Sequence, residues 1–576
     1  MLHGCVKKMG PYPEFSSRYP LLLRSFMLRP ATLLPRKIGV VYRNPISGQY
    51  FRFTWREWYE RTCRLANALT TRLNVKKGDI VATMALNHHR HLELYYAVPC
   101  IGAILHTINV RYSVEQIIYV IKHAGDKVLF FDDVFLPLVE AIYDKIKPPV
   151  ESFVYMSDPP AQVPKTKVEP IYDYESLLSD MPAEFEWPYF DENTYATLCY
   201  TSGTTGLPKG VMFTHRQLYL HALHSIVAST SNADPAASRL GEATVTMINI
   251  PMFHIHAWGA PHTSVLLGHK VVLPGRFTPQ GFCELVQTEK VTHTALVPTM
   301  LAMLVEYPDL KKYDLSSLKE VAVGGAALPP GLKSKAEKLI PGFTATAGYG
   351  MTETAPVISG SYIKSYMREW PKEKLDEVRV KTGLPLPGLE VLVVDEEGKP
   401  VPWDGKTIGE IVVRGPWVME EYYKDPERTA EAWRGGWFHT GDLATVDEEG
   451  YLTIVDRAKD VIRSGAEMVP TVLLENVTMT SDLVLEAAYV GVPDEKWGER
   501  PLALVKLRPG VSCSEEDIYK FLLEQCERGK LARWMLPDYI AIVDEIPMTS
   551  VGKFDKKEIK KRLNEYLAKA KRVHRA

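Results

Sequence analysis

Cysteine is scarce in this sequence, and its spacing excludes the common cysteine-based sites. The seven cysteines are scattered, odd in number and never arranged as a Cys-x-x-Cys pair, so neither a disulfide framework nor a zinc or redox motif is indicated. A reducing compartment is therefore expected, and we predict a cytoplasmic protein. Long apolar runs are missing as well. None approaches the roughly 20 residues of a membrane-spanning helix, so no integral membrane segment is expected.

The chain has no excess of either charge. Its 68 Lys and Arg residues nearly balance its 70 Asp and Glu residues, for a net charge of −2, so no overall field favours nucleic acid or an anionic membrane. The first 30 residues are basic, with Glu14 as the sole acidic residue. They leave an organelle transit segment open, although a cytosolic start is preferred.

Helix and strand signals alternate over the first 150 residues, which is typical of a wound parallel α/β sheet. Thr54 and Glu57 form a capping box before an amphipathic run. The apolar segment Ile80–Met84 that follows predicts a buried strand. The same alternation returns across 240–350, so two wound sheets are expected.

The pattern changes in the second half of the chain. Short alternating strands with Asp-Gly turns occupy 388–413, which indicates a small β-rich subdomain. The polar run at 456–460 is interpreted as a hinge. The expected fold class is α/β, with a large N-terminal domain at 1–456 made of two wound α/β subdomains and the β-rich subdomain. A small mobile α+β C-terminal domain is expected at 457–576.

One run of hydroxyls, glycines and a lysine, at 200–210, is suited to bind phosphate. Its hydroxyls can donate hydrogen bonds, its glycines permit close approach of backbone N–H groups, and its lysine adds a point charge. A Walker A loop is excluded because Pro208 rather than Gly precedes the lysine. Taken alone, the run fits a solvated polar turn equally well. The candidate phosphate-binding residues are Thr201, Ser202, Gly203, Thr204, Thr205, Gly206 and Lys209.

Five further runs combine with the first. They are Tyr-Gly-Met-Thr-Glu-Thr at 349–354, Phe-His-Thr-Gly-Asp at 438–442, Asp-Arg-Ala-Lys-Asp at 456–460, Ser-Gly-Ala-Glu at 464–467 and Pro-Met-Thr-Ser-Val-Gly-Lys at 547–553. In order and spacing the set resembles the adenylate-forming superfamily of acyl-CoA synthetases, luciferases and peptide-synthetase adenylation domains. The resemblance spans almost the entire chain. Additional runs at 87–93, 124–129 and 251–258 are especially similar to the medium- and long-chain fatty-acyl-CoA synthetase branch.

The resemblance implies an AMP-forming carboxylic acid:CoA ligase that uses ATP, Mg²⁺ and coenzyme A. In the first step the carboxylate attacks the α-phosphorus of ATP and gives an acyl-adenylate and pyrophosphate. In the second step the CoA thiolate displaces AMP. A medium- or long-chain fatty acid is favoured, while the acid itself and a homodimer are left open. The alternatives are a luciferase-like oxidoreductase, a stand-alone adenylating enzyme serving another acceptor, and a non-catalytic sensor of ATP or acyl-AMP.

For the phosphates, the resemblance implies that the 201–209 loop holds the β and γ groups while charge moves onto the leaving pyrophosphate. Thr352 is expected to donate a hydrogen bond to the α-phosphate. Glu353 is a hard oxygen ligand suited to Mg²⁺, which bridges phosphates.

For the nucleoside, the resemblance implies that Tyr349 offers a flat face to adenine, with Gly325 and Ala326 as a thin wall opposite. Asp442 is expected to accept both ribose hydroxyls. Arg457 is expected to approach the ribose or the phosphate. The plainer alternative for Tyr349 is packing in a Gly-flanked turn.

For the acyl group, the resemblance points to His254 and Trp258, with Gly350 at the same site. In the fatty-acyl branch the tryptophan of this run resembles a gate on the acyl tunnel. The plainer alternative for His254 and His256 is that both are core histidines bonded to the backbone. A histidine metal site is disfavoured because no third ligand is spaced with them.

The C-terminal runs imply a domain movement in which two lysines have different roles. Lys553 is expected to reach the reacting carboxylate and α-phosphate when the small domain closes, and Lys459 is expected to be the pivot. Gly465 and Ala466 are expected on the CoA side in the second step. Ala466 replaces a usual glycine, which puts thioester formation rather than adenylation in question. Phe554 after the catalytic lysine is a second departure from the pattern.

Overall fold

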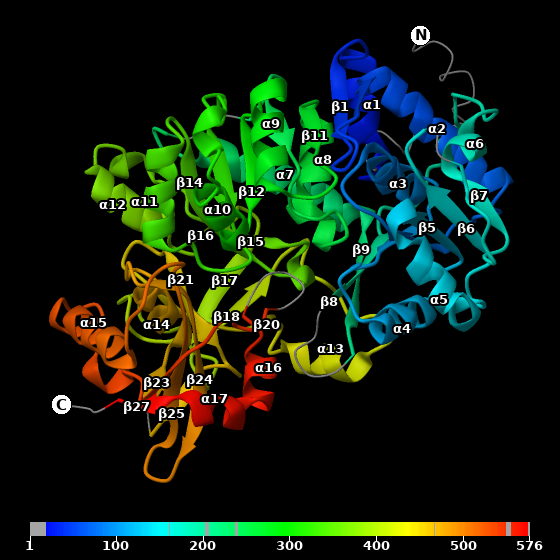
Figure 1. Ribbon diagram of the computed structural model, residues 1–576. Helices are drawn as coiled ribbons and strands as arrows, with labels where there is room; N and C mark the ends of the chain where they lie inside the picture. The colour runs from blue at the N-terminus through cyan, green and yellow to red at the C-terminus, as the bar shows by residue number, and fades with distance from the viewer. Residues whose placement is uncertain are drawn as a thin grey trace.

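The structure is a computed structural model that describes residues 19–159, 162–201, 207–236, 240–465, 467–548 and 554–573. These residues form four β-sheets with helices packed on them. Figure 1 shows the first wound sheet in blue and cyan, the second mainly in green, and the C-terminal unit in orange and red. In the described residues, no helix is both long and apolar enough to cross a bilayer. The six cysteines that the structure describes are all free thiols.

The first wound sheet has seven strands in the order β7-β6-β5-β3-β4-β8-β9. All neighbours run parallel except β8 and β9, which pair antiparallel. The strands are β3 (Ile80–Met84), β4 (Ile104–Thr107), β5 (Val128–Asp132), β6 (Ser152–Met156), β7 (Ile171–Asp173), β8 (Tyr195–Thr201) and β9 (Lys209–Thr214). The predicted strand at Ile80–Met84 is confirmed and is fully buried.

The second wound sheet has nine strands in the order β16-β15-β14-β13-β12-β10-β11-β1-β2. They are β1 (Ile38–Arg43), β2 (Tyr50–Thr54), β10 (Val245–Met247), β11 (Lys270–Leu273), β12 (His293–Leu296), β13 (Glu320–Val323), β14 (Thr344–Gly350), β15 (Val357–Gly360) and β16 (Leu384–Pro385). β1 and β2 belong to this sheet although they precede the first one in the sequence, because β1 pairs in parallel with β11. The chain therefore crosses between the two sheets more than once.

Helices cover both wound sheets. The capping box predicted at Thr54 and Glu57 is confirmed at the start of the second helix. The helices are α1 (Arg24–Leu33), α2 (Trp55–Thr71), α3 (His89–Cys100), α4 (Val114–Ala124), α5 (Leu136–Ile146), α6 (Tyr174–Leu178), α7 (His215–Ser231), α8 (Ala260–Leu267), α9 (Pro279–Glu289), α10 (Pro298–Val305), α11 (Pro330–Leu339) and α12 (Lys372–Arg379).

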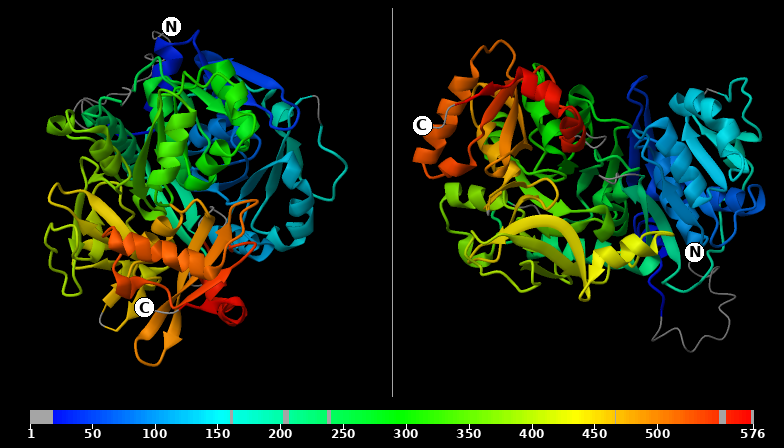
Figure 2. Two further views of the ribbon diagram at one scale, coloured as in Figure 1. Left: turned by 60° about the vertical axis from the view of Figure 1, so that its left-hand side comes forward. Right: turned by 90° about the horizontal axis from the view of Figure 1, so that it is seen from below.

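A five-stranded sheet and a six-stranded sheet complete the fold. The former contains β17 (Glu390–Val394), β18 (Gly409–Arg414), β19 (Trp433–Arg434), β20 (Trp437–Val446) and β21 (Leu452–Arg457), with α13 (Pro426–Ala432) beside them. The latter contains β22 (Ile462–Ser464), β23 (Glu467–Val469), β24 (Val484–Asp494), β25 (Gly498–Leu507), β26 (Tyr539–Ile542) and β27 (Lys571–Arg572). Its helices are α14 (Thr471–Thr478), α15 (Glu515–Glu527), α16 (Lys556–Lys561) and α17 (Leu563–Lys569). The expected β-rich sheet and α+β C-terminal unit are both present, and Figure 2 shows the latter against the green and yellow parts of the chain.

A buried asparagine joins the two wound sheets. Asn87 follows β3, and its side-chain amide donates to the carbonyls of Ile248 and Ile250 at 2.8 Å each. Its side-chain oxygen accepts the N–H of Met252 at 2.8 Å. Its backbone pairs with Gly275 just beyond β11. All four partners follow strands of the second sheet, so one side chain fixes the seam between the sheets.

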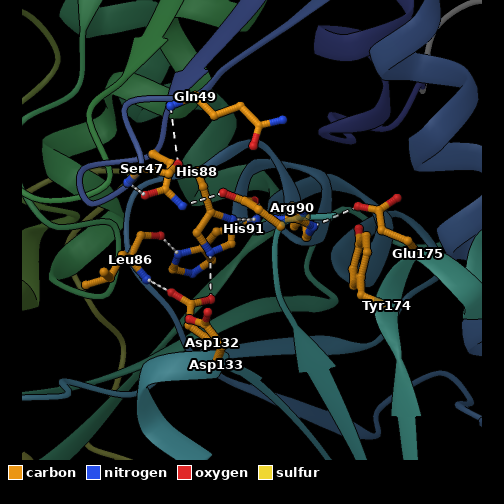
Figure 3. A network of polar contacts seen from close by, with 12 residues as sticks. Ser47, Gln49, Leu86, His88, Arg90, His91, Asp132, Asp133, Tyr174 and Glu175 are labelled. Atoms are coloured by element: carbon orange, nitrogen blue, oxygen red, sulfur yellow. Dashed lines mark hydrogen bonds and ion pairs between the residues drawn. The ribbon is translucent and has the colours of Figure 1, made fainter. Parts of the chain in front are cut away.

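The residues after Asn87 form a buried charged network at the start of α3 (Figure 3). His88 Nε2 lies 2.7 Å from Asp132 Oδ1 at the end of β5. Arg90, only 2% exposed, binds Asp158 and Glu175, each at 2.8 Å. Pairing of this kind is what permits charged side chains in a protein interior. Asn44, which follows β1 of the second sheet, donates its side-chain amide to Asp158 at 2.6 Å, so the network reaches across the junction of the sheets.

Replacing Asn87 with Ala should destabilise the protein strongly. The substitution leaves two carbonyls and one N–H without their partner in a buried seam, and each such group costs roughly 1–3 kcal/mol. We expect the free energy of unfolding to fall by at least about 3 kcal/mol, measured by calorimetry. The control is Asn193→Ala, in an exposed turn where the amide donates to the Asp191 carboxylate at 3.0 Å. Equal effects of the two substitutions would contradict the role of Asn87.

Candidate active site

A large cleft opens where the carboxyl ends of both wound sheets meet the β-rich sheet and the C-terminal unit. It encloses about 3400 Å³. Ligands in open α/β sheets bind at this end of the strands. Its lining includes most of the predicted site residues that the structure describes, namely Thr201, Lys209, His254, Trp258, Gly325, Ala326, Tyr349, Gly350, Thr352, Glu353, Asp442, Arg457 and Lys459. Segments up to 258 residues apart in sequence therefore converge on one site.

Seven predicted residues lie outside the described part of the chain. They are Ser202, Gly203, Thr204, Thr205, Gly206, Ala466 and Lys553. Their predicted roles in phosphate binding, on the CoA side and in catalysis stay predictions. The residues that border the phosphate run, Thr201 at the end of β8 and Lys209 at the start of β9, both line the cleft.

Three predicted nucleoside residues contact one another across two sheets. Tyr349, near the end of β14, donates its hydroxyl to Asp442 Oδ2 at 2.7 Å. Arg457 Nε lies 3.1 Å from Asp442 Oδ1, because β20 and β21 pair these two residues directly. Burial and the Asp442 carboxylate raise the pKa of Tyr349 well above its ordinary value. Desolvation opposes the charge of Arg457, but Asp442, Tyr349, Asp460 and Glu353 together outweigh it and raise the pKa of that guanidinium.

A second group of contacts surrounds Glu353, which is 6% exposed. Tyr422 donates its hydroxyl to Glu353 Oε1 at 2.8 Å. Lys209 Nζ lies 3.9 Å from the centre of the Tyr422 ring, a cation–π contact. Desolvation lowers the pKa of Lys209, although the Glu353 carboxylate opposes that shift. Tyr422 thus links the lysine beside the phosphate run to the predicted metal ligand.

Lys459, the predicted pivot, adds a further positive charge to this site. Lys459 is exposed in the cleft, yet partial desolvation and the neighbouring Arg457 charge lower its pKa to about 8. Lys209 contributes to the same shift. Because three cations gather here, a bound polyanion would be attracted strongly.

Gly350 is a steric requirement of the site. A Cβ built at this position would lie 2.0 Å from the carbonyl oxygen of Pro356, so no other residue fits without moving the backbone. Met351 N–H bonds to the same carbonyl at 3.0 Å. This glycine therefore fixes the turn that presents Thr352 and Glu353 to the cleft.

The acyl-side tryptophan stands in a strained turn. His256, Ala257 and Trp258 have φ values of 49°, 43° and 59°, in the left-handed region that costs energy for residues with a Cβ. The indole of Trp258 packs against the loop after β13, so a Cβ at Gly324 would lie 3.2 Å from it. Three successive residues in this conformation are a sign of a functional constraint.

The two neighbouring histidines differ. His254 lines the cleft, whereas His256 is fully buried. His256 Nε2 lies 2.8 Å from the Thr197 hydroxyl, and burial lowers its pKa well below the ordinary value. His256 is thus a core histidine, bonded to a side-chain hydroxyl rather than to the backbone. Among the described residues, no group of three or more His, Cys, Asp or Glu is arranged to hold a metal ion.

Sequence reasoning missed Tyr422 and Glu410. Glu410 in β18 accepts the N–H of Gly441 at 2.9 Å and lies 2.8 Å from His439 Nδ1, so it braces the loop that presents Asp442. Both residues line the cleft. The sequence around Tyr422 and Glu410 contains no pattern that indicates ligand binding, because each residue acts through a partner that is distant in sequence.

On the C-terminal side, Met548 and Phe554 pair antiparallel and both line the cleft. They flank the undescribed run that contains Lys553. Gly465 is not part of the lining. Its N–H bonds to the carbonyl of Trp497 at 2.6 Å, and the indole of Trp497 covers it. The structure therefore brings the border of the Lys553 run to the cleft, whereas Gly465 lies outside the cleft lining.

Two family models match the chain. The model described as "AMP-binding enzyme" covers residues 29–423, and the model described as "AMP-binding enzyme C-terminal domain" covers 473–553. The long-chain-fatty-acid–CoA ligase of Thermus thermophilus is 42% identical over 97% of this chain and 99% of its own length. The 3-methylmercaptopropionyl-CoA ligase of Ruegeria lacuscaerulensis is 37% identical over 90% and 93%.

Solved structures share the fold. The anthranilate CoA ligase AuaEII, in complex with anthranoyl-AMP, superposes with a TM-score of 0.82 over 95% of this chain and 99% of its own, at 24% identity. At that identity the likeness concerns the arrangement of elements alone. It supports the expected division into a large α/β part and a smaller C-terminal part.

Proposed function

We propose that this chain, which belongs to the AMP-binding enzyme family and is an acyl-CoA synthetase of it, activates a medium- or long-chain fatty acid with ATP and transfers it to CoA. The observation that carries the site assignment is the convergence of Tyr349, Asp442 and Arg457 with Lys209 and Glu353 on one cleft. For a nucleotide bound there, Asp442 would accept from the ribose hydroxyls. Lys209 and Glu353 would serve the phosphates.

In the first step, Asp442 would hold the ribose hydroxyls while Arg457 neutralises charge beside it. Tyr349 would present its ring to adenine, because its hydroxyl is already engaged with Asp442. The carboxylate of the acid attacks the α-phosphorus, and the bond from that phosphorus to the bridging oxygen breaks. The products are acyl-AMP and pyrophosphate, whose growing charge Lys209 and the hydroxyls of the 201–205 run would stabilise.

Glu353 fits a Mg²⁺ ion by the chemistry of its donor atoms. A buried carboxylate beside a phosphate site is the hard oxygen ligand that Mg²⁺ takes in proteins, and Tyr422 orients it through the hydrogen bond to Oε1. When bound, the ion would neutralise phosphate charge. Thr352, presented by the same turn, would donate to the α-phosphate.

In the second step the CoA thiolate attacks the acyl carbonyl and AMP leaves. We propose that the division at 456/457 separates a large domain from a mobile small one, and that rotation about Lys459 exchanges two faces of the small domain. The face beside Met548 and Phe554 would bring Lys553 to the first step, and the loop with Gly465 and Ala466 would serve the second. Closure of this kind completes a site only when substrate is present.

The acid would enter past Trp258. Its indole lines the cleft and packs against the loop that holds Gly324 and Gly325, the latter a residue of the predicted adenine wall. In the Thermus thermophilus and Ruegeria lacuscaerulensis relatives the named acids differ greatly in length. The resemblance to the fatty-acyl branch favours the longer acids for this chain. The free thiols of the described cysteines are compatible with the cytoplasm proposed as its location.

Replacing Lys553 with Ala should separate the two half-reactions. If this lysine stabilises the charge that develops in the first step, pyrophosphate exchange should fall at least about 100-fold. Conversion of supplied acyl-adenylate to acyl-CoA should remain close to that of the parent. Lys569→Ala, at an exposed position of α17 that is not part of the cleft lining, is the control and should change neither rate. Equal loss in both half-reactions would rule out the assigned role.

Replacing Trp258 with Ala should change the preference for acid length. Acid-dependent AMP formation is measured across carboxylates graded by length and polarity. The ratio of kcat/KM between acids two methylenes apart should move by about tenfold or more. Trp403→Ala, at an indole that is 59% exposed away from the cleft, should leave the ratio unchanged. If the Trp258 variant keeps the parent's preference for acid length, Trp258 does not belong to the acyl site.

A further inference from the structure

A buried polar cluster, here called the hinge cluster, joins β21 to the C-terminal unit. It consists of Asp456 in β21, Thr471 and Glu475 in α14, and Lys556 in α16. Asp456 is 2% exposed, and its Oδ2 accepts the N–H and the hydroxyl of Thr471 at 2.8 and 2.6 Å. Lys556 Nζ lies 2.9 Å from Glu475 Oε1 and 3.9 Å from Asp456 Oδ1.

The contacts of the cluster are mutually supporting. Lys556 also donates to the Thr471 hydroxyl, and Glu475 Oε1 accepts the N–H of Tyr489 at 3.0 Å. Desolvation opposes the charge of Lys556, but the carboxylates of Glu475 and Asp456 outweigh it and raise its pKa. Removing one partner from such a group would leave a buried charge uncompensated.

The hinge cluster spans the proposed pivot. Asp456 precedes Lys459, while Thr471, Glu475 and Lys556 all follow it. A rotation about Lys459 carries the last three residues as one body. The ion pair between Lys556 and Glu475 would therefore survive the rotation, and the contacts of Asp456 with Thr471 and Lys556 would break.

The same cluster is connected to the border of the Lys553 run. Asp555 N–H bonds to the carbonyl of Pro547 at 2.8 Å, and Asp555 caps the first turn of α16, where it accepts the N–H of Glu558. Lys556 is the first residue of that helix. Its buried contacts thus fix the helix that follows Phe554 while Phe554 and Met548 line the cleft.

We propose that Asp456, Thr471 and Lys556 form a latch that holds the small domain in its adenylation orientation, and that Lys556 is a positioning residue for Lys553. The inference rests on the proposed function, because it needs the two orientations. When the latch opens, the buried Asp456 carboxylate loses the donors of Thr471 and its contact with Lys556, and keeps the N–H of Arg457. The free-energy cost of losing these contacts sets the fraction of the protein that occupies the thioester-forming orientation.

The test compares three variants with a matched control. Thr471→Val, Asp456→Asn and Lys556→Met each weaken the latch. Thr478→Val removes an equally buried hydroxyl from the same helix, where it bonds to Leu474 and Tyr489 within the small domain. Thr471→Val should slow pyrophosphate exchange about tenfold, the range for one hydrogen bond to a charged group. Conversion of supplied acyl-adenylate to thioester should be unchanged or faster.

A second measurement needs no activity. Arg508 in the small domain lies 3.7 Å from Glu306 in the large one. A protein that carries both Glu306→Cys and Arg508→Cys can therefore be cross-linked with a bismaleimide, and the yield reports the orientation of the small domain. The singly substituted proteins give the background of native thiols. Cross-linking should fall in the three latch variants and stay at the parent level with Thr478→Val.

Two results would overturn the latch: equal loss of both half-reactions in Thr471→Val and Lys556→Met, or cross-linking unchanged from the parent. Lys556→Arg keeps the charge and should restore part of the exchange rate, whereas no recovery would argue against positioning by charge. If the parent itself showed no pyrophosphate exchange, the proposed function would fall. The cross-linking comparison would then still decide for or against the latch.

Discussion

The active site depends on the seam that holds the carboxyl ends of two parallel sheets side by side. Each sheet alone would present its loops to solvent. Asn87 ties the end of β3 to the loops after β10 and β11, and the network at the start of α3 reaches the second sheet where Asp158 accepts the amide of Asn44, just beyond β1. The phosphate-side strands β8 and β9 belong to the first sheet, while Tyr349 lies in β14 of the second sheet and Trp258 and Glu353 follow strands of that sheet. Without a fixed seam, these two halves of the site could not meet.

The second constraint is electrostatic. Lys209, Arg457 and Lys459 all line the cleft, and partial desolvation, with the charges of Arg457 and Lys209, lowers the pKa of Lys459 to about 8. Asp442 and Glu353 offset part of that charge, and both carboxylates are held by tyrosine hydroxyls. Such an arrangement is costly for the empty protein and favourable once a polyphosphate is bound, so the site is organised for a charged ligand before the ligand arrives.

Much of this was predictable where the signal is local. The capping box at Thr54 and the buried strand Ile80–Met84 depend on neighbours in sequence, and the runs around Tyr349, Asp442 and Arg457 carry the family resemblance. The partners that act at long range were not predictable. β1 and β2 join the second sheet because of a pairing with β11, which no local pattern encodes. Tyr422, Glu410 and the Asp456–Lys556 contact are made by ordinary residues whose importance comes only from what the fold places beside them.

The central claim is that a carboxylate attacks the α-phosphorus of ATP in this cleft before CoA takes the acyl group. Turnover of a fatty acid labelled with ¹⁸O in both carboxylate oxygens, in the presence of ATP and CoA, tests this directly by mass spectrometry of the nucleotide product. Because the attacking oxygen stays on phosphorus when the thiolate displaces AMP, the account predicts AMP that carries one ¹⁸O atom, formed in step with acyl-CoA. Unlabelled AMP, or ADP with the label in phosphate, would contradict it.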